Sequence, residues 1–389
     1  MKLKHGLHLA YCTNIHRGEN WAETFHNLQH YTLAVRERVA PRVPYAIGLR
    51  LGVQAARELA DPGQLAGFRR WLDDHDCYVF TINGFPYGQF HGTRVKEQVY
   101  APDWTTQERL DYTCLLFDVL GQLVPDGVEG SVSTVPVSFK EFMKEPRQEA
   151  AARSKLWQCV ESVEKASRKW GRRLHLGLEP EPLCHLETTP ETVAFFDRMQ
   201  RDRPGDLRLR EHLGVNYDCC HLAVEFESAG LSLEKLKQSG IRISKLHLSS
   251  ALRVSPNPEV RQALREFADD TYFHQVVARS AGGEITRYRD LDVALAGHNH
   301  LPPALTDEWR IHFHIPLHSG PTALFQTTSD HLKEALDWLG THPGLCTHLE
   351  METYTWEVMP AELKRRSVVD QLVAEYDWTL VELRKRGLA

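Results

Sequence analysis

Carboxylate and imidazole side chains recur at the ends of β-rich segments in the second half of the chain. Glu179 ends an apolar run in LHLGLEPEP, and Asp218 ends the run LGVNYD, with His221 one helical turn later. His247 lies inside the strand-like segment SKLHLSS. Hard oxygen donors mixed with imidazole suit Mn, Mg, Co, Zn or Fe(II) better than they suit soft metals. The pattern therefore indicates a divalent-metal site.

The last of these segments, THLEMETY, offers two further carboxylates. Glu350 and Glu352 are two positions apart, so they lie on one face of a strand. A lone carboxylate at a strand end could equally cap a loop or pair with an arginine, and a lone histidine such as His247 is more often a buried core residue. The coincidence over four segments favours a shared site.

A run of three histidines precedes that last segment. IHFHIPLH places His312, His314 and His318 on one alternating face of an extended chain. These residues either complete a metal site or line its mouth. We include His314 in the predicted ligand set, together with His221.

Polar residues near the third and fourth predicted strands are candidates for substrate binding. The loop NGFPYGQFHGTRVKEQVY is rich in glycine and aromatic residues and contains Asn83, His91, Arg94 and Lys96. Such a loop could hold a polyol or a phosphate, and an ordinary aromatic-stabilised turn explains its composition equally well. We predict Asn83 and His91 as substrate-binding residues, with Lys140 as a weaker candidate of the same type.

These residues must be positioned by alternating strands and helices. Short β-rich segments recur along the chain, each followed by a stretch with helix-start signals, which predicts parallel βαβ units. The eight predicted strands are Gly6–Tyr11, Tyr45–Leu51, Tyr78–Asn83, Val128–Val135, Arg173–Glu179, Leu213–Asp218, Ile243–Leu248 and Cys346–Thr353.

Helix-start signals follow several of the predicted strands. Asn20 and Glu23 have the spacing of a capping box, and Asp61 followed by Pro62 is typical of an N-cap and a first helical residue. Thr106 precedes another apolar stripe, and Thr189 with the next proline opens a helix after the fifth strand. Each connection therefore has its helix.

The alternation predicts an α/β fold, namely a (β/α)8 TIM barrel forming a single domain over residues 1–389. No G-x-G-x-x-G or G-x-x-x-x-G-K-[ST] follows any strand, which removes the usual support for a doubly wound nucleotide-binding sheet. Residues 252–310 break the rhythm before the last strand and are predicted to form an insertion over the barrel mouth. Trp309–Pro316 is a candidate ninth strand.

The amino-acid composition disfavours several classes of function. A 42% hydrophobic content predicts an ordinary globular core, and the net charge of −6 without long runs of one sign disfavours nucleic-acid binding. The eight scattered cysteines, including the adjacent Cys219 and Cys220, are expected to be reduced and buried. Neither a signal peptide nor a membrane span is apparent, so we expect a cytoplasmic protein.

The order Glu, Asp, His, Glu over the last four strands resembles the xylose isomerase-like superfamily, which includes sugar isomerases, sugar epimerases and endonuclease IV-type enzymes. The Asp218-x-x-His221 pair is similar to the D-x-x-H of the endonuclease branch. The segments HLAYCTNIHRGENW, TINGFPYGQFHGTRVKEQVYAPDW, STVPVSFK and LEMETYTWEVMP resemble the EboE family. Members of that family are encoded in ebo gene clusters associated with moving secondary-metabolite precursors across the inner membrane.

The resemblance to this superfamily implies which residues bind the metal and which transfer protons. It gives Glu179, Asp218, His247 and Glu352 as metal ligands, with Glu350 as the fallback for Glu352. In the epimerases the two glutamates also move protons on either face of a carbon next to a carbonyl, so Glu179 and Glu352 would be the acid/base pair. The third and fourth strands offer Asn83 and Ser133–Thr134 where the endonucleases supply histidines, so a three-metal nuclease site looks incomplete.

Three functions remain after this comparison. The leading one is a divalent-metal-dependent isomerase or epimerase acting on a sugar-like or hydroxylated metabolite, with other ebo-cluster proteins as candidate partners. The second is a metabolite-binding or traffic protein without turnover, because a barrel fold does not dictate function. Phosphodiester hydrolysis at apurinic sites is disfavoured by the acidic net charge, since phosphate contacts need a basic face.

Overall fold

Eight parallel strands form a nearly closed barrel, in the order β1-β13-β7-β6-β5-β4-β3-β2. The computed structural model describes residues 1–90, 95–268, 271–297, 307–355 and 366–389. A parallel bridge between Cys12 and Gly48 joins the two ends of this order. The predicted (β/α)8 barrel is confirmed. Its strands are β1 (His8–Tyr11), β2 (Tyr45–Arg50), β3 (Cys77–Asn83), β4 (Gly130–Thr134), β5 (Leu174–Leu178), β6 (Leu213–Asp218), β7 (Arg242–Leu248) and β13 (His348–Met351).

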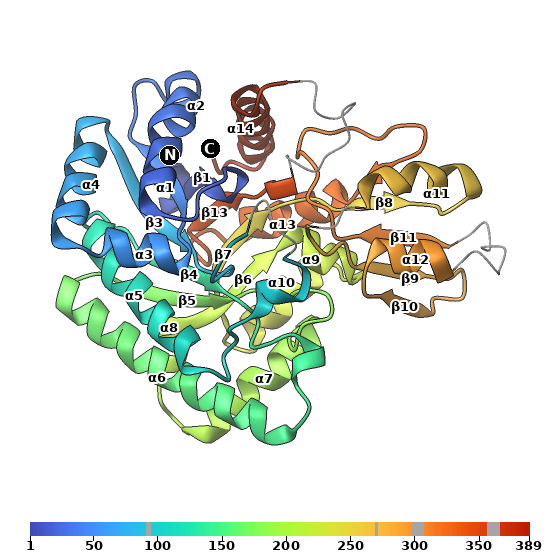
Figure 1. Ribbon diagram of the computed structural model, residues 1–389, viewed down its shortest axis with the longest axis horizontal. Coiled ribbons are helices and arrows are strands. Elements are labelled where there is room, and N and C mark those ends of the chain that lie inside the picture. The colour runs from blue at the N-terminus through green and yellow to red at the C-terminus, as the bar shows by residue number, and fades with distance from the viewer. Residues whose placement is uncertain (91–94, 269–270, 298–306, 356–365) are drawn as a thin grey trace.

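Helices connect successive strands and cover the outside of the barrel (Figure 1). They are α1 (Trp21–Asn27), α2 (Leu33–Val39), α3 (Val53–Leu59), α4 (Pro62–Asp74), α5 (Gln107–Leu123), α6 (Pro146–Trp170), α7 (Thr189–Asp202), α8 (Arg208–His212), α9 (Cys219–Val224), α10 (Ala229–Gln238), α13 (Ser329–Thr341) and α14 (Val368–Lys385). A π-helical turn, Leu28–Thr32, joins α1 to α2. Short 3-10 helices span Lys4–Gly6, Thr13–Ile15, Lys96–Tyr100, Lys140–Phe142 and Arg265–Phe267.

The predicted helix starts are observed. The side chains of Asn20, Asp61 and Thr106 accept backbone N–H groups at the first turns of α1, α4 and α5. The helix α7 begins at Thr189 as predicted, and Thr188 is its cap: the Thr188 hydroxyl accepts the N–H of Glu191, while the Glu191 carboxylate accepts the N–H of Thr188. This reciprocal pair is a capping box.

The segment before the last barrel strand forms a second sheet of five strands, in the order β10-β9-β11-β8-β12. These strands are β8 (Leu252–Val254), β9 (Val276–Arg279), β10 (Ile285–Tyr288), β11 (Glu308–Ile311) and β12 (Gln326–Thr327), accompanied by α11 (Pro258–Leu264) and α12 (Leu291–Gly297). This subdomain lies beside the barrel, in yellow and orange in Figure 1.

Two predicted boundaries in this region are wrong. The predicted insertion ends at residue 310, whereas the second sheet continues to Thr327 because β12 pairs with β8. The candidate strand Trp309–Pro316 is not a barrel strand: β11 ends at Ile311 and pairs antiparallel with β8 and β9. The alternating pattern of this segment marks a strand, but it carries no information about which sheet the strand joins.

Polar side chains form layers inside the barrel, next to an apolar cluster of Ala10, Ala46 and Phe80. The layers arise because alternate residues of each strand point inward. On and just after β13 these are His348, Glu350 and Glu352. The ring of His348 lies 5.3 Å from that of His175 in the lowest layer. Above it, the Lys245 ammonium lies 2.5 Å from the Glu350 carboxylate. Glu352 reaches the carboxyl ends of the strands.

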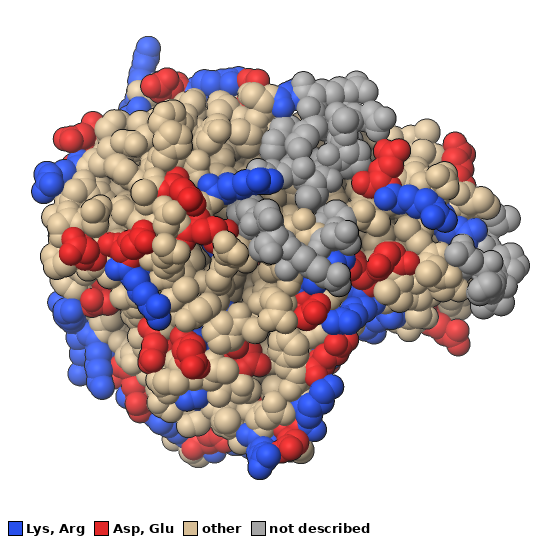
Figure 2. All heavy atoms as spheres, viewed as in Figure 1, with Lys and Arg blue, Asp and Glu red and all other residues tan. Residues whose placement is uncertain are grey.

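Two observations concern the described helices and the distribution of charge on one face of the molecule. Over the described residues, no helix combines the length and the apolar character needed to cross a bilayer. On the face shown in Figure 2, acidic and basic side chains are interspersed. The two ends of the chain lie together, since the N–H of Lys4 donates to the carbonyl of Leu388.

The glycine at position 48 makes room for the charged layer. A methyl group built at Gly48 would lie 2.1 Å from Glu350 Oε1 and 2.7 Å from the carbonyl oxygen of Tyr11. We therefore expect Gly48→Ala to lower the free energy of unfolding by about 1–3 kcal/mol, the usual cost of overpacking. Urea unfolding would measure it. Gly320→Ala is the matched control, because a methyl group there meets no atom within 4 Å; equal stabilities of the two variants would contradict the argument.

Candidate metal centre and cavity

Four buried side chains meet at the carboxyl ends of neighbouring strands. Glu179 directly follows β5, Asp218 ends β6, His247 lies on β7 and Glu352 directly follows β13. Each offers one ligand atom, and these atoms all lie within 4.8 Å of one another. None of the four residues is more than 4% exposed. We call them the carboxylate group.

The ring of His247 lies at the centre of the carboxylate group. Its Nδ1 is 3.1 Å from Glu179 Oε1, 3.3 Å from Asp218 Oδ2 and 3.2 Å from Glu352 Oε2. One ring nitrogen carries at most one proton, so it cannot satisfy three carboxylates. Asp218 Oδ2 is accordingly a buried acceptor without a hydrogen-bond partner. Three carboxylate oxygens therefore face one point, and they are not all satisfied by hydrogen bonds. A cation bound at this point would compensate their buried negative charge.

The charges of the carboxylate group perturb one another. Burial opposes the charged form of His247, but Glu352 and Glu179 outweigh it, so the pKa of His247 lies well above its usual value. Burial likewise opposes ionisation of Asp218, yet the imidazoles of His221 and His314 hold the pKa of this carboxyl well below its usual range. For Glu352, His247 overcomes the burial penalty and lowers the pKa.

The structure places Glu352, rather than Glu350, in the carboxylate group. Glu350 lies one layer lower, between Lys245 at 2.5 Å and His247 Nε2 at 2.8 Å. Burial disfavours its ionisation, but the ammonium of Lys245 and the ring of His247 lower the pKa of Glu350 to about 2. Glu350 is therefore ionised, and its carboxylate contacts Nε2 of His247 and so fixes the orientation of this ring.

Amide and hydroxyl donors fix the carboxylates. Asn14 and Asn83 donate to Glu352 Oε1 at 2.8 and 3.0 Å, and Asn216 donates to Glu179 Oε2 at 2.6 Å. The Ser249 hydroxyl donates to Asp218 Oδ1 at 2.7 Å. Each carboxylate thus keeps its other oxygen towards His247.

A cavity opens over the carboxylate group. Its walls combine six aromatic side chains, from three segments far apart in the sequence, with eight polar or charged side chains. It is lined by Asn14, Asn83, Phe85, Pro86, Phe90, Val95, Lys96, Val99, Tyr100, Glu179, Glu181, His221, Tyr272, Phe273, His312, Glu352 and Tyr354. Aromatic walls with converging polar groups are typical of a small-molecule site.

The predicted site residues are distributed unevenly around this cavity. Asn83 and His221 line it, and His314 lies beside it, with its Nδ1 donating to the carbonyl oxygen of Glu352 at 3.0 Å. Lys140 is not among the lining residues; its ammonium pairs with Glu187 and with Glu191. His91 lies outside the described residues.

Sequence reasoning missed three polar residues that the fold brings to the site. Glu181 accepts a hydrogen bond from the Tyr100 hydroxyl at 2.7 Å, and Gln275 donates to that hydroxyl at 2.8 Å. Burial raises the pKa of Glu181 to about 7, partly offset by His221. Its position two residues after Glu179 was the only available signal. Nothing local marked Tyr100 or Gln275.

The donor set fits a divalent ion. Together with Glu350, the site holds four buried carboxylates against one lysine and one central imidazole. An excess of buried negative charge is costly unless a cation neutralises it. Three carboxylates and one imidazole are hard to borderline ligands, suited to Mn, Mg, Co, Zn or Fe(II).

The fold is similar to that of solved xylose isomerase-like barrels. A xylose isomerase domain protein from Planctomyces limnophilus is 13% identical, with a TM-score of 0.52 over 91% of this chain and 93% of that one. An L-ribulose 3-epimerase is 12% identical, with a TM-score of 0.52 over 99% and 96%. A D-tagatose 3-epimerase-like protein is 12% identical, with a TM-score of 0.50 over 96% and 98%. No protein-family model matches the chain, and neither does any curated protein sequence.

The buried pair of Lys245 and Glu350 provides a test of this electrostatic layer. Lys245→Met leaves a buried carboxylate without its cation, and we expect the free energy of unfolding to fall by about 3–5 kcal/mol at neutral pH. The double variant Lys245→Met/Glu350→Gln should recover much of this loss, because no uncompensated charge remains.

The loss in the free energy of unfolding caused by Lys245→Met should also depend on pH. The folded pKa of Glu350 is depressed from 4.5 to about 2, so its stabilising contribution is present above 4.5 and disappears as the pH falls towards 2. In Lys245→Met the unpaired carboxyl takes up its proton at a higher pH. The stability difference from wild type should therefore be largest at neutral pH and shrink on acidification. Urea unfolding at several pH values measures it, and a pH-independent difference would refute the assignment.

Proposed function

We propose that this protein is a divalent-metal-dependent isomerase or epimerase acting on a small sugar-like or hydroxylated metabolite. The observation that carries the proposal is the convergence of Glu179, Asp218, His247 and Glu352 within 4.8 Å at a cavity. A bound divalent ion would polarise a carbonyl oxygen of the substrate and stabilise the negative charge that develops on it.

Two carboxylates of the group are available for proton transfer. Glu179 and Glu352 both line the cavity and come from non-adjacent strands, β5 and β13. Asn216 holds one carboxylate and Asn14 and Asn83 hold the other, so each keeps its orientation. A carbon next to a carbonyl, placed between them, can lose a proton to one carboxylate and regain it from the other. Positioned acid/base groups of this kind contribute roughly 10²–10⁴-fold to a rate.

The cavity wall supports a small polar substrate. The rings of Phe90, Tyr272 and Tyr354 pack on one another with centroids 5.1–5.4 Å apart and cover one side. This wall excludes water from a reactive carbanion-like species. Lys96, whose ammonium pairs with Asp290 at 2.5 Å, also lines the cavity.

We further propose a cellular setting for this activity. The resemblance to the EboE family supports a substrate among secondary-metabolite precursors, with other ebo-cluster proteins as candidate partners. The eight cysteines are all unpaired, which agrees with a reducing compartment such as the cytoplasm.

The test combines metal content with hydrogen exchange. Protein purified without added metal is analysed by plasma mass spectrometry, then incubated in D2O with a panel of ketoses and hydroxyketones and followed by NMR. We expect deuterium to enter at the carbon next to the carbonyl. Glu179→Gln and Glu352→Gln should slow this exchange about 10²–10⁴-fold, while Asp218→Asn and His247→Gln should also lose metal.

His318→Gln is the matched control, since this histidine belongs to none of the ligand groups of the described residues. A wild-type protein that binds none of Mn, Mg, Co, Zn or Fe(II) would contradict the proposal. Stoichiometric metal and tight metabolite binding without exchange would instead favour a metabolite-binding protein. Nicking of an abasic oligonucleotide would point to phosphodiester hydrolysis.

A further inference from the structure

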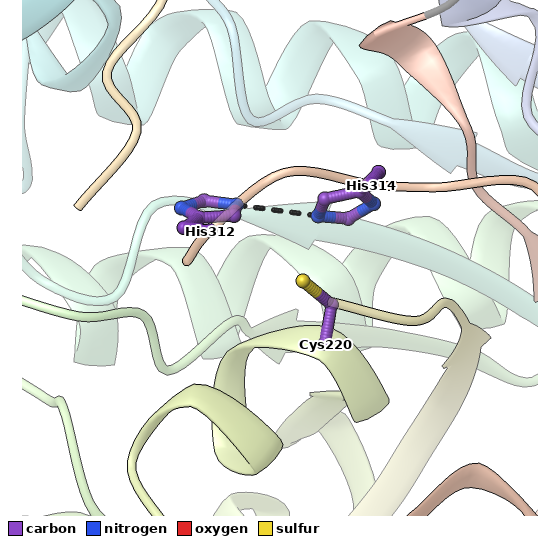
Figure 3. Close-up of side chains that lie close together, drawn as sticks. All are labelled: Cys220, His312 and His314. Carbon is purple, nitrogen blue, oxygen red and sulfur yellow. Dashed lines mark hydrogen bonds between the residues drawn. The ribbon is translucent and has the colours of Figure 1, made fainter. Parts of the chain in front are cut away.

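A hollow of about 400 Å³ lies at the amino-terminal ends of the barrel strands. It is at the opposite end of the barrel from the carboxylate group and from the buried rings of His312 and His314 (Figure 3). Its charged lining residues are Glu129, Arg173, Arg210, Lys237 and Arg242. Four of these side chains are cationic and one is a carboxylate, although the whole chain has a net charge of −6. We call it the basic hollow.

Helix ends account for only part of this positive charge. Arg210 lies in the last turn of α8 and Lys237 in the last turn of α10, where the helix dipole favours cations. Arg242 is instead the first residue of β7, and Arg173 directly precedes β5. The helix dipole therefore gives no reason for these two arginines to line the same hollow as the other two cations.

The carboxylate of the basic hollow is shared by two of its arginines. An oxygen of Glu129 lies 3.0 Å from Arg242, and the other oxygen lies 3.5 Å from Arg173. Lys237 pairs with Glu234, which does not line the hollow. One carboxylate thus faces the guanidinium groups of two arginines, and an excess of positive charge remains inside the hollow.

Arg210 is available to bind an anion. Within the described part of the chain, no carboxylate forms a salt bridge with it. Its guanidinium packs on Gly240, where the backbone φ is +67° and an added methyl group would lie 3.3 Å from Arg210 Cζ. The glycine therefore lets the guanidinium approach the loop before β7 closely. An arginine has five N–H donors and no acceptor, so its best partner is an anion with several oxygens.

We propose that the basic hollow binds a diphosphate group, either as free pyrophosphate or as part of a nucleotide. A guanidinium group offers paired N–H donors that match phosphate oxygens, and a lysine ammonium adds a compact positive charge. The three arginines and the lysine come from different elements around the hollow, so they can contact two linked phosphates at once. The volume of about 400 Å³ lies within the usual range of small-molecule sites, about 300–1,000 Å³.

The basic hollow lies at the starts of the same strands that carry the carboxylate group at their other ends. Its lining residues belong to the segments that lead into β5, β6, β7 and β13. A bound diphosphate would join these segments by hydrogen bonds, and a ligand that binds only the folded state stabilises it. The proposal is independent of the proposed function, because none of the residues that line the cavity lines the hollow.

The experiment is isothermal titration calorimetry on the full-length protein, dialysed into a buffer of low ionic strength without free metal. We expect one equivalent of pyrophosphate to bind, about tenfold more tightly than inorganic phosphate, because a second phosphate group gains its own charge-assisted hydrogen bonds. Arg210→Gln should weaken pyrophosphate binding about tenfold. Glu129→Gln should strengthen it roughly threefold, because a nearby like charge is removed.

Arg70→Gln is the matched control. Arg70 is an exposed residue of α4 that does not line the hollow, so this variant loses the same charge at a different place. Its affinity for pyrophosphate should equal that of the wild type. An equal loss of affinity in Arg70→Gln and Arg210→Gln would overturn the site, and so would equally weak binding of phosphate, sulfate and pyrophosphate.

A measurement without substitutions locates the anion. Amide hydrogen exchange, followed by mass spectrometry, should slow on addition of pyrophosphate in residues 208–213, 237–243 and 343–348. Protection confined to the residues of the cavity would overturn the site. Titration with ADP separates the two sources of the diphosphate. Tighter binding of ADP than of pyrophosphate would support the site as one for a nucleotide, and the reverse order would support it as one for free pyrophosphate.

Discussion

The contacts of the His247 ring link two charged layers inside the barrel. Nδ1 faces three carboxylates at the strand ends, and Nε2 contacts Glu350 in the layer below, which Lys245 neutralises. Buried charges at this density are tolerated only when each has a partner. Amide donors hold the carboxylates of Glu179 and Glu352 beside this ring, and one oxygen of Asp218 is left without a hydrogen-bond partner.

The barrel geometry explains why these layers exist. Alternate residues of a strand point to opposite faces, so β13 sends His348, Glu350 and Glu352 inward at successive heights. Helices cover the outward-facing residues, which are apolar. Space inside is limited, and Gly48 provides it beside Glu350. The alternation of side chains along each strand therefore places apolar residues under the helices and lines up polar residues inside the barrel, towards the cavity.

The second sheet adds chemistry that the barrel strands do not supply. The stretch from β8 to β12 contributes Tyr272, Phe273 and Gln275 to the region of the cavity, and the chain after β11 brings His312 and His314 against α9. An oxygen-rich group and a nitrogen-rich group thus meet at Asp218.

The sequence by itself indicated the barrel, its eight strands and three residues of the carboxylate group (Glu179, Asp218 and His247), because strand alternation and strand ends are local properties of the chain. The choice between Glu350 and Glu352 was open at that level, since two residues on one face of a strand differ only in height along the barrel. Tertiary structure decided it through Lys245, which is 105 positions from Glu350 and pairs with it. It also decided the sheet to which β11 belongs, the placing of Lys140 on Glu187 and Glu191, and the meeting of His221 with His312. Those outcomes depend on contacts between distant segments, for which residue type and spacing carry no local signal.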